Sequence, residues 1–140
     1  MKILFIGFYH PPDLSAGSYR TSALIDELLK VMPPKSQIEV ITSLRKRYNR
    51  FSAGVPKREE QQGVVIYRMR LPKHRNSFFG QSLSFLVFAI GAIKIARGER
   101  PDLVFGRSSG LMTAILASFV ARKYNTLLYL NSRDLFLETL

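Results

Sequence analysis

The sequence contains no cysteine and only two histidines, His10 and His74, among its 140 residues. Without thiols the chain cannot form disulfides, a cysteine-ligated metal site or a cysteine nucleophile. Two isolated histidines do not make a histidine-rich metal site, so we expect no metal centre and no cofactor. The lack of cysteine is typical of a reducing compartment and predicts a cytoplasmic protein.

Two glycine-based nucleotide-binding motifs are also missing. Gly7 begins the stretch GFYHPP, where a dinucleotide-binding turn requires G-x-G-x-x-G. No P-loop occurs anywhere in the chain. Residues 106–110, GRSSG, have the letters of a G-x-S-x-G nucleophile elbow, with Ser108 at the serine position. Ser108 and Ser109, which precede Gly110, are better explained as a helix N-cap than as nucleophiles. The two absences argue against a dinucleotide dehydrogenase and a P-loop nucleotidase, and the N-cap interpretation of Ser108 and Ser109 argues against an α/β-hydrolase.

Acidic residues are scarce, since 10 Asp and Glu accompany 21 Lys and Arg and the net charge is +11. Most of the surplus lies in residues 45–75, where Glu59 and Glu60 are the only carboxylates. Such a basic stretch predicts a polyanionic partner: an acidic membrane surface, a phosphate-bearing substrate or nucleic acid. Aromatic residues are not interleaved with the cations as a base-stacking platform requires, so a basic nucleic-acid-binding module is the alternative rather than the main hypothesis. A merely solvated basic face is the third interpretation.

Alternating strand and helix patterns predict one Rossmann-like α/β domain over residues 1–140. Strands are expected at residues 3–8, 37–42, 64–69, 102–106 and 126–131. Helices are expected from near residue 18 to 32, from 78 or 79 to 97, and over 111–123. Residues 43–62 are interpreted as a long basic loop, and the apolar residues 83–96 as a core helix too short to span a bilayer. Right-handed crossovers predict a doubly wound, mostly parallel sheet with strand order 3-2-1-4-5.

In that order the chain direction reverses between the first and fourth strands, the place where such folds bind ligands. The loops at residues 9–18 and 107–110 would flank the crevice. Gly17 lets the backbone approach a ligand closely, and a helix beginning near Ser18 directs free N–H groups and the positive end of its dipole there. We therefore expect an anion at this point.

Two side chains near the crevice allow two interpretations each. Arg20 lies in the first turn of the helix, where a cation opposes the dipole, so it either holds an anionic ligand or pairs with Asp13 or the loop. His10 lies at the end of the first strand, where it either polarises a ligand or fills the loop.

Three stretches together resemble the N-terminal domain of retaining GT-B glycosyltransferases, glycosyl transferase group 1 or family 4, in the branch that builds bacterial surface polysaccharides. The stretches are KILFIGFYHPPDLSAGSYRTSALIDELLK, ERPDLVFGRSS and SRDLFLETL, the last similar to that branch's R-D-L-W-P-E. In that family two Rossmann-like domains face each other across a cleft. The N-terminal domain holds the acceptor, and the C-terminal domain binds most of the nucleotide-sugar donor. The resemblance implies that residues 1–140 are the acceptor-side half of a hexosyltransferase, lack the nucleotide-sugar domain and transfer no sugar alone.

The resemblance also implies roles for individual residues. Gly17 matches the glycine loop that approaches the donor phosphates, and Arg20 matches the arginine that commonly follows it. Arg133 and Asp134 match an arginine–aspartate pair after the fifth strand, which makes Asp134, with Glu138 four residues later, a candidate catalytic pair. Without the family, these two carboxylates are simply helix N-terminal acids. Phosphate or acceptor binding is expected of His10, Gly17, Ser18, Arg20, Arg107, Ser108, Ser109 and Arg133.

The implied partners are a nucleotide-sugar donor, a lipid-linked, phosphate-bearing saccharide acceptor and a C-terminal domain, for which a separate partner chain is one source. The basic loop and the helix start bring cations and apolar groups together, as in interfacial membrane binding. We expect an acidic membrane to be faced by Arg70, Lys73, Arg75, Phe78 and Phe79. Residues 86–95 are expected to be buried against the sheet. The predicted location is peripheral, on the inner face of the cell membrane.

Overall fold

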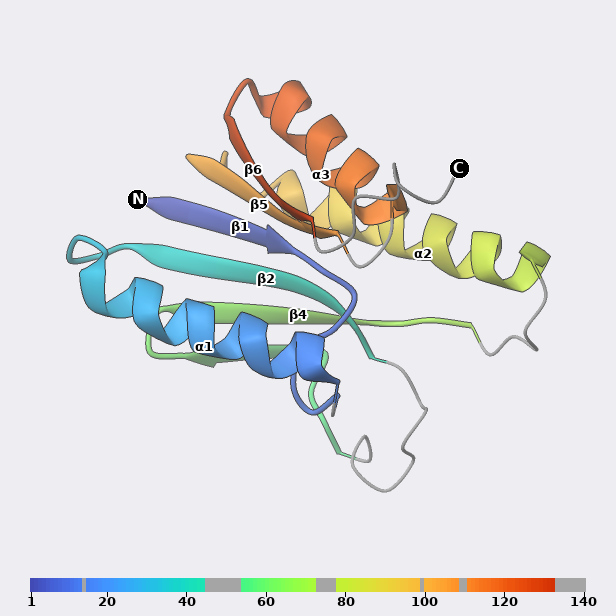
Figure 1. Ribbon diagram of the computed structural model, residues 1–140, viewed down its shortest axis with the longest axis horizontal. Helices are drawn as coiled ribbons and strands as arrows, with labels where there is room; N and C mark the ends of the chain where they lie inside the picture. The colour runs from blue at the N-terminus through green and yellow to red at the C-terminus, as the bar shows by residue number, and fades with distance from the viewer. Residues whose placement is uncertain (14, 45–53, 73–77, 99, 109–110, 133–140) are drawn as a thin grey trace.

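A computed structural model describes residues 1–140 except 14, 45–53, 73–77, 99, 109–110 and 133–140 (Figure 1). The expected parallel strands form its centre. In chain order the elements are β1 (Lys2–Ile6), α1 (Ala16–Val31), β2 (Gln37–Leu44), β3 (Arg58–Gln61), β4 (Val64–Arg70), α2 (Phe78–Ala96), β5 (Leu103–Ser108), α3 (Leu111–Tyr124) and β6 (Leu127–Ser132). They form a six-stranded sheet with the order β3-β4-β2-β1-β5-β6. Every neighbouring pair is parallel except β3 with β4. For the five expected strands this is the order 3-2-1-4-5, so the Rossmann-like, doubly wound prediction is confirmed.

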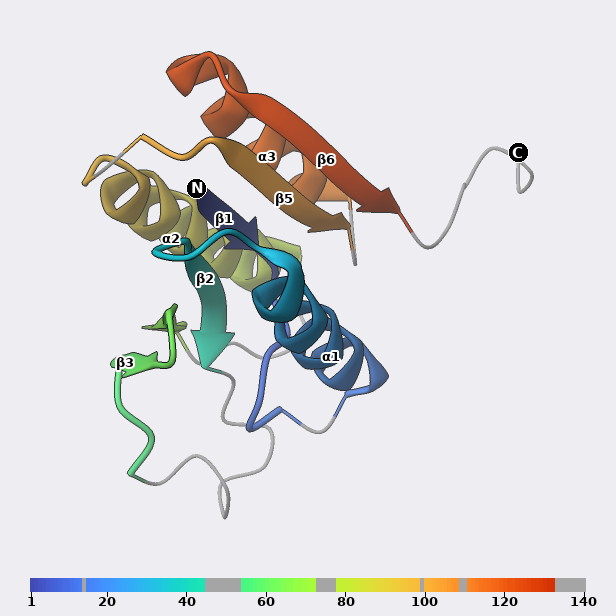
Figure 2. The same cartoon turned by 90° about the vertical axis from the view of Figure 1, so that its left-hand side faces the viewer.

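Side chains alternate between the two faces of the sheet, and each face has its own apolar layer. The layer against α1 contains the buried residues Ile3, Phe5, Ile25, Ile38, Val40, Val64 and Phe105. The layer against α2 and α3 contains Leu4, Ile6, Ile41, Phe88, Ala92, Ala96, Val104, Leu116, Ala117, Val120 and Ala121. Figure 2 shows α1 on one side of the sheet and α2 and α3 on the other. At about 1.5–3 kcal/mol for each large apolar side chain removed from water, these layers are the main stabilising term.

The helices begin and end close to the predicted residues. α1 starts at Ala16, two residues earlier than expected, because Ser15 caps it: the Ser15 Oγ accepts a hydrogen bond from the Ser18 N–H at 3.2 Å. It ends at Val31, before two prolines that could not continue it. The polypeptide therefore leaves β1, crosses a short loop and enters α1 at the carboxyl edge of the sheet.

The prediction of a loop over residues 43–62 is wrong at both of its ends. β2 continues to Leu44, and residues 58–61 form β3, which pairs antiparallel with β4. Gln62 and Gly63, both with positive φ, make the two-residue turn that joins these strands. The β3 sequence REEQ has no apolar alternation because an edge strand that is largely exposed needs none. Pairing with β4 thus creates a strand that no periodicity could reveal.

The expectation that residues 83–96 form a core helix is only partly correct. Phe88, Ala92 and Ala96 are fully buried against the sheet, whereas Leu86 is 55% exposed and Ile90 is 47% exposed. A helix packed on a sheet buries one side, and this helix is apolar all round, so its pattern could not show which side. α2 is also longer than the apolar run, and its stretch Phe79–Ala96 has a mean hydropathy of 1.6, enough by length and composition to cross a membrane. Only 22% of that stretch is buried in the structure.

Candidate functional site

The candidate site lies at the ends of β1 and β5, which are neighbours in the sheet. After these two strands the chain continues to opposite faces of the sheet. β1 leads through residues 7–15 into α1 on one face, and β5 leads into α3 on the other face. Both strands end at the same edge because they are parallel. This is the topological switch point of the sheet, where doubly wound folds bind ligands.

Arg107 extends from the end of β5 to the first turns of α1. Its Nη1 donates a hydrogen bond to the Gly17 carbonyl oxygen at 2.5 Å and a very short one to the Thr21 Oγ1. The Thr21 hydroxyl in turn donates to the Gly17 carbonyl oxygen at 3.0 Å. Arg107 is 9% exposed, so its cation is held largely out of water beside the N-terminus of a helix. That end of a helix already carries positive partial charge, so guanidinium and helix together favour an anion there.

Gly17 is packed beside this guanidinium. A Cβ placed on Gly17 would lie 3.8 Å from Arg107 Nη2 and 3.6 Å from Ser15 Oγ, which is ordinary van der Waals contact. The protein itself could therefore accept an alanine at this position. Gly17 keeps the approach to the first turn of α1 open rather than relieving a clash.

Ser18 carries a buried hydroxyl that nothing described satisfies. The residue is fully buried, and its Oγ has no hydrogen-bond partner among the residues that the structure describes. Its N–H is bonded to the Ser15 cap, and the Ser15 N–H in turn donates to Asp13 Oδ1 at 2.9 Å. A buried hydroxyl without a partner is costly, which makes Ser18 a candidate to meet a ligand oxygen.

A second polar cluster lies on the α1 face at the ends of β2 and β4. Arg68 is 7% exposed; its Nη1 lies 2.7 Å from Glu59 Oε2, and its Nη2 donates to the Pro11 carbonyl oxygen at 3.3 Å. The Arg68 Nε and the Oγ1 of Thr42, its register partner on β2, are buried and have no partner within the described ranges. Arg68 thus fixes the loop after β1 through the Pro11 carbonyl oxygen, and Glu59 of β3 balances the charge of Arg68.

His10 belongs to this cluster. It is buried, and its Nδ1 lies 3.4 Å from the Pro11 carbonyl oxygen. Burial lowers the pKa of His10, and the Arg68 cation lowers it further, whereas the Pro11 carbonyl and Glu59 act in the opposite direction. The imidazole is therefore neutral near neutral pH and adds no positive charge to the crevice.

Some of the other predicted site residues are described by the structure, and the rest lie outside the described residues. Arg20 is exposed on α1 and makes no ion pair with Asp13 in the described part of the chain, where Asp13 accepts from Ser15 instead. Arg70 and Phe79 are exposed, and Phe78 and Ser108 occupy the first residue of α2 and the last of β5. Outside the described residues lie Lys73, Arg75, Ser109, Arg133, Asp134 and Glu138. Their predicted roles remain predictions.

Three polar residues of the site were not predicted: Thr21, Thr42 and Arg68. A signal for two of them was present, because Thr42 and Arg68 occupy the same strand face as the buried Val40 and the partly buried Ile66. A polar residue on the buried side of an alternating strand points to a buried polar contact. Thr21 had no comparable signal, since its partner lies 86 residues further along the chain.

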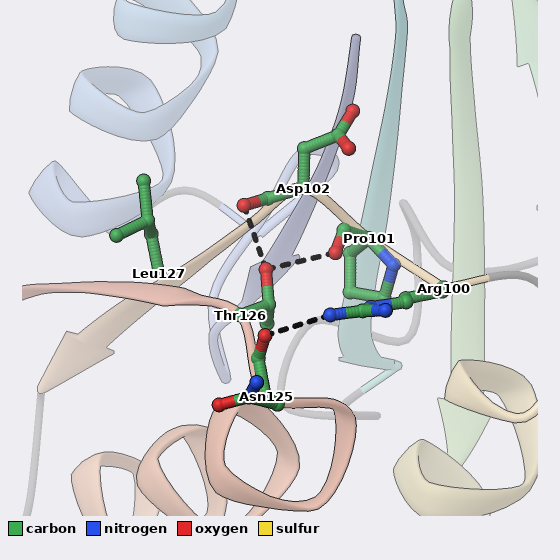
Figure 3. A pocket seen from close by; sticks show the side chains of 6 residues that line it. All are labelled: Arg100, Pro101, Asp102, Asn125, Thr126 and Leu127. Carbon is green, nitrogen blue, oxygen red and sulfur yellow. Dashed lines mark hydrogen bonds between the residues drawn. The ribbon is translucent and has the colours of Figure 1, made fainter.

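A pocket of about 460 Å³ lies at the opposite, amino edge of the sheet (Figure 3). It is lined by Arg100, Pro101, Asp102, Asn125, Thr126 and Leu127. Its polar groups already bind one another: Arg100 Nη2 donates to the Asn125 carbonyl oxygen at 2.9 Å, and Thr126 Oγ1 bonds the Pro101 carbonyl oxygen at 2.8 Å. These bonds join the starts of β5 and β6, so we assign this pocket a structural role. Across the described ranges, no three His, Asp or Glu side chains gather as metal ligands would.

No family model and no curated protein matches the sequence. Among solved structures, the C-terminal domain (residues 83–215) of a hydrogenase from Pyrococcus furiosus is similar, with a TM-score of 0.59 and 13% identity over 93% of this chain and 90% of that one. A second structure of that domain, residues 78–226, gives 0.55 and 12% over 93% and 89%. A UGT transferase from Siraitia grosvenorii in complex with UDP gives 0.48 and 14%, over 93% of this chain but 27% of that one. At such identities the hydrogenase likeness shows the fold alone, and the third is too remote to support an argument.

Proposed function

We propose that residues 1–140 are the acceptor-binding half of a glycosyltransferase that moves a sugar from a nucleotide-sugar donor to a lipid-linked or polysaccharide acceptor. The observation that carries the proposal is the contact of Arg107 with Gly17. It joins two of the stretches that resemble the GT-B family, 90 residues apart in the sequence, at the ligand-binding edge of the sheet.

The chemistry of this edge suits a phosphate group. First-turn amides of α1, the dipole of the helix and the guanidinium of Arg107 all favour negative charge at one place. Hydrogen bonds from a guanidinium to phosphate are charge-assisted and about twice as strong as neutral ones. The unpartnered Ser18 hydroxyl offers one more donor. Both the nucleotide-sugar donor and a lipid-linked acceptor carry such phosphates.

The proposal includes inactivity of these 140 residues alone. The described chain forms one Rossmann-like sheet, whereas the mechanism of the family requires a second domain for the nucleotide. Incubation with labelled UDP-glucose and membranes should therefore give no transfer. Turnover by the purified chain, free of other enzymes, would overturn this part of the proposal.

Calorimetry with UDP and with glucose 1-phosphate tests the phosphate site directly. Gly17→Ala should leave the fold intact, because the added methyl meets only ordinary contacts, but it should weaken binding by narrowing the approach to α1. Arg97→Gln, an exposed cation after the end of α2, is the matched control and should bind as the parent does. Absence of binding of both compounds to the folded protein would refute the site, as would equal binding by the parent and Gly17→Ala.

A further inference from the structure

The outer side of the α2 and α3 layer is apolar. The exposed large side chains of α2 are Phe79, Leu83, Leu86, Val87 and Ile90, and those of α3 are Leu111, Met112, Ile115 and Phe119. In each helix they recur at helical spacing, so each makes one stripe. The two helices contact one another and lie on the same face of the sheet (Figure 1). We call the two stripes together the apolar face.

An apolar face of this size is unusual for a protein surface that meets only water. Single exposed apolar side chains are common, but nine on two helices that contact one another are more than an ordinary surface carries and are typical of a binding surface. The sheet cannot be their partner, because Phe88 and Ala92 already occupy the buried side of α2. Within the part of the chain that the structure describes, no element covers the exposed stripe.

The charges near the apolar face indicate what kind of partner it binds. Neither helix sequence contains Asp or Glu. The cations on or next to the helices are Lys94, Arg97, Arg122 and Lys123, and Arg70 is exposed at the end of β4. An apolar face with cations and without carboxylates complements a bilayer that contains anionic lipids, which offers hydrocarbon and negative headgroups together.

We propose that the apolar face of α2 and α3 binds in the interface of an anionic lipid bilayer, with both helices lying along the surface so that the apolar side chains of their first turns and the cations of their last turns meet it together. The most exposed side chains of the face, Phe79 at 85% and Leu111 at 71%, lie in those first turns. Both turns are at the carboxyl edge of the sheet, and α2 projects past the ends of the strands there (Figure 1). The bilayer then lies beside the edge that holds Arg107 and Gly17. The proposal differs from the sequence-based one in using the full length of α2 and adding α3.

Flotation with vesicles tests the surface without any sugar or nucleotide, so its failure is distinct from failure of the proposed function. The chain should bind vesicles of phosphatidylcholine with about one third phosphatidylglycerol, bind pure phosphatidylcholine weakly, and dissociate as salt rises from about 0.05 to 0.5 M. Leu86→Ser with Ile90→Ser should reduce the bound fraction at least tenfold. Tyr19→Ser with Val31→Ser is the matched control, because it removes two exposed apolar side chains from α1 on the opposite face, and it should bind as the parent does. Retained binding by the α2 variant, equal binding to both vesicle types or binding to neither would overturn the proposal.

Depth can be measured because the chain has no tryptophan. A single Phe79→Trp should shift its fluorescence to the blue on binding vesicles and be quenched by brominated acyl chains. Tyr19→Trp on α1 should show neither effect. An unshifted Trp at residue 79, or a dimer in light scattering that Leu86→Ser with Ile90→Ser dissociates, would assign the face to another partner and refute the bilayer.

Discussion

Arg107 at the end of β5 donates a hydrogen bond to Thr21 in α1, although the two residues are 86 positions apart in the sequence. Both residues are buried, so the bond is shielded from water. It fixes the first turns of α1 against the switch point and keeps a cation beside the N-terminus of the helix. The contact is therefore both a structural tie and the centre of the candidate site.

Replacing Thr21 with valine should destabilise the fold by about 1–3 kcal/mol, because it leaves a buried guanidinium with one acceptor fewer. Thr21→Ser, which retains the hydroxyl, should recover most of that loss. Urea denaturation followed by circular dichroism measures both variants. Equal stability of the valine variant and the parent would show that other groups satisfy Arg107 fully.

Arg20→Ala should weaken binding of glucose 1-phosphate by about 1.5–3 kcal/mol, the range for a hydrogen bond to a charged group. The side chain is exposed, so the free energy of unfolding should change by no more than about 0.5 kcal/mol. Calorimetry with the parent and the variant measures the binding difference. Unchanged affinity would leave phosphate binding to Arg107 and α1.

Stability should fall as the pH drops below the ordinary histidine pKa of about 6.5. Burial lowers the pKa of His10 in the folded chain, so the unfolded chain binds the proton more readily and acid favours unfolding. Arg68 adds to this effect, while Glu59 and Asp26 oppose it. Urea midpoints between about pH 7.5 and pH 5.5 should show the decline. His10→Gln should flatten that profile; identical slopes for His10→Gln and the parent would contradict the assignment.

Gly106→Ala should destabilise the fold by about 1–3 kcal/mol through overpacking. A Cβ at Gly106 would lie 2.6 Å from the Ala117 Cβ and 2.7 Å from Leu130 Cδ2, where β5 meets α3 and β6. Gly98→Ala is the control, because its Cβ would meet only the Ile95 carbonyl oxygen at 3.5 Å. Thermal unfolding of the two variants should separate them clearly. Equal melting temperatures would mean that α3 can shift away from β5 at little cost.

Local sequence was sufficient for most of the fold. The apolar run of β1, the helical spacing in α1 and the repeated alternation of strands and helices predict a parallel sheet, and right-handed crossovers then determine the strand order. The position of Gly17 beside the end of β5 follows from that order, because parallel strands bring their carboxyl ends to one edge. These features depend on residues close together in the sequence and on general rules of chain connection.

The tertiary structure decided the rest. β3 exists because β4 offers it a pairing edge, and Thr21 meets Arg107 because the crossover brings them together, so neither has a local signature. The exposed side of α2 was equally hidden, since a helix that is apolar all round carries no record of which side the sheet covers. The hydrophobic periodicity of a helix or strand shows only whether one of its sides is more apolar than the other. A contact between residues distant in the sequence depends instead on where the whole chain places its helices and strands.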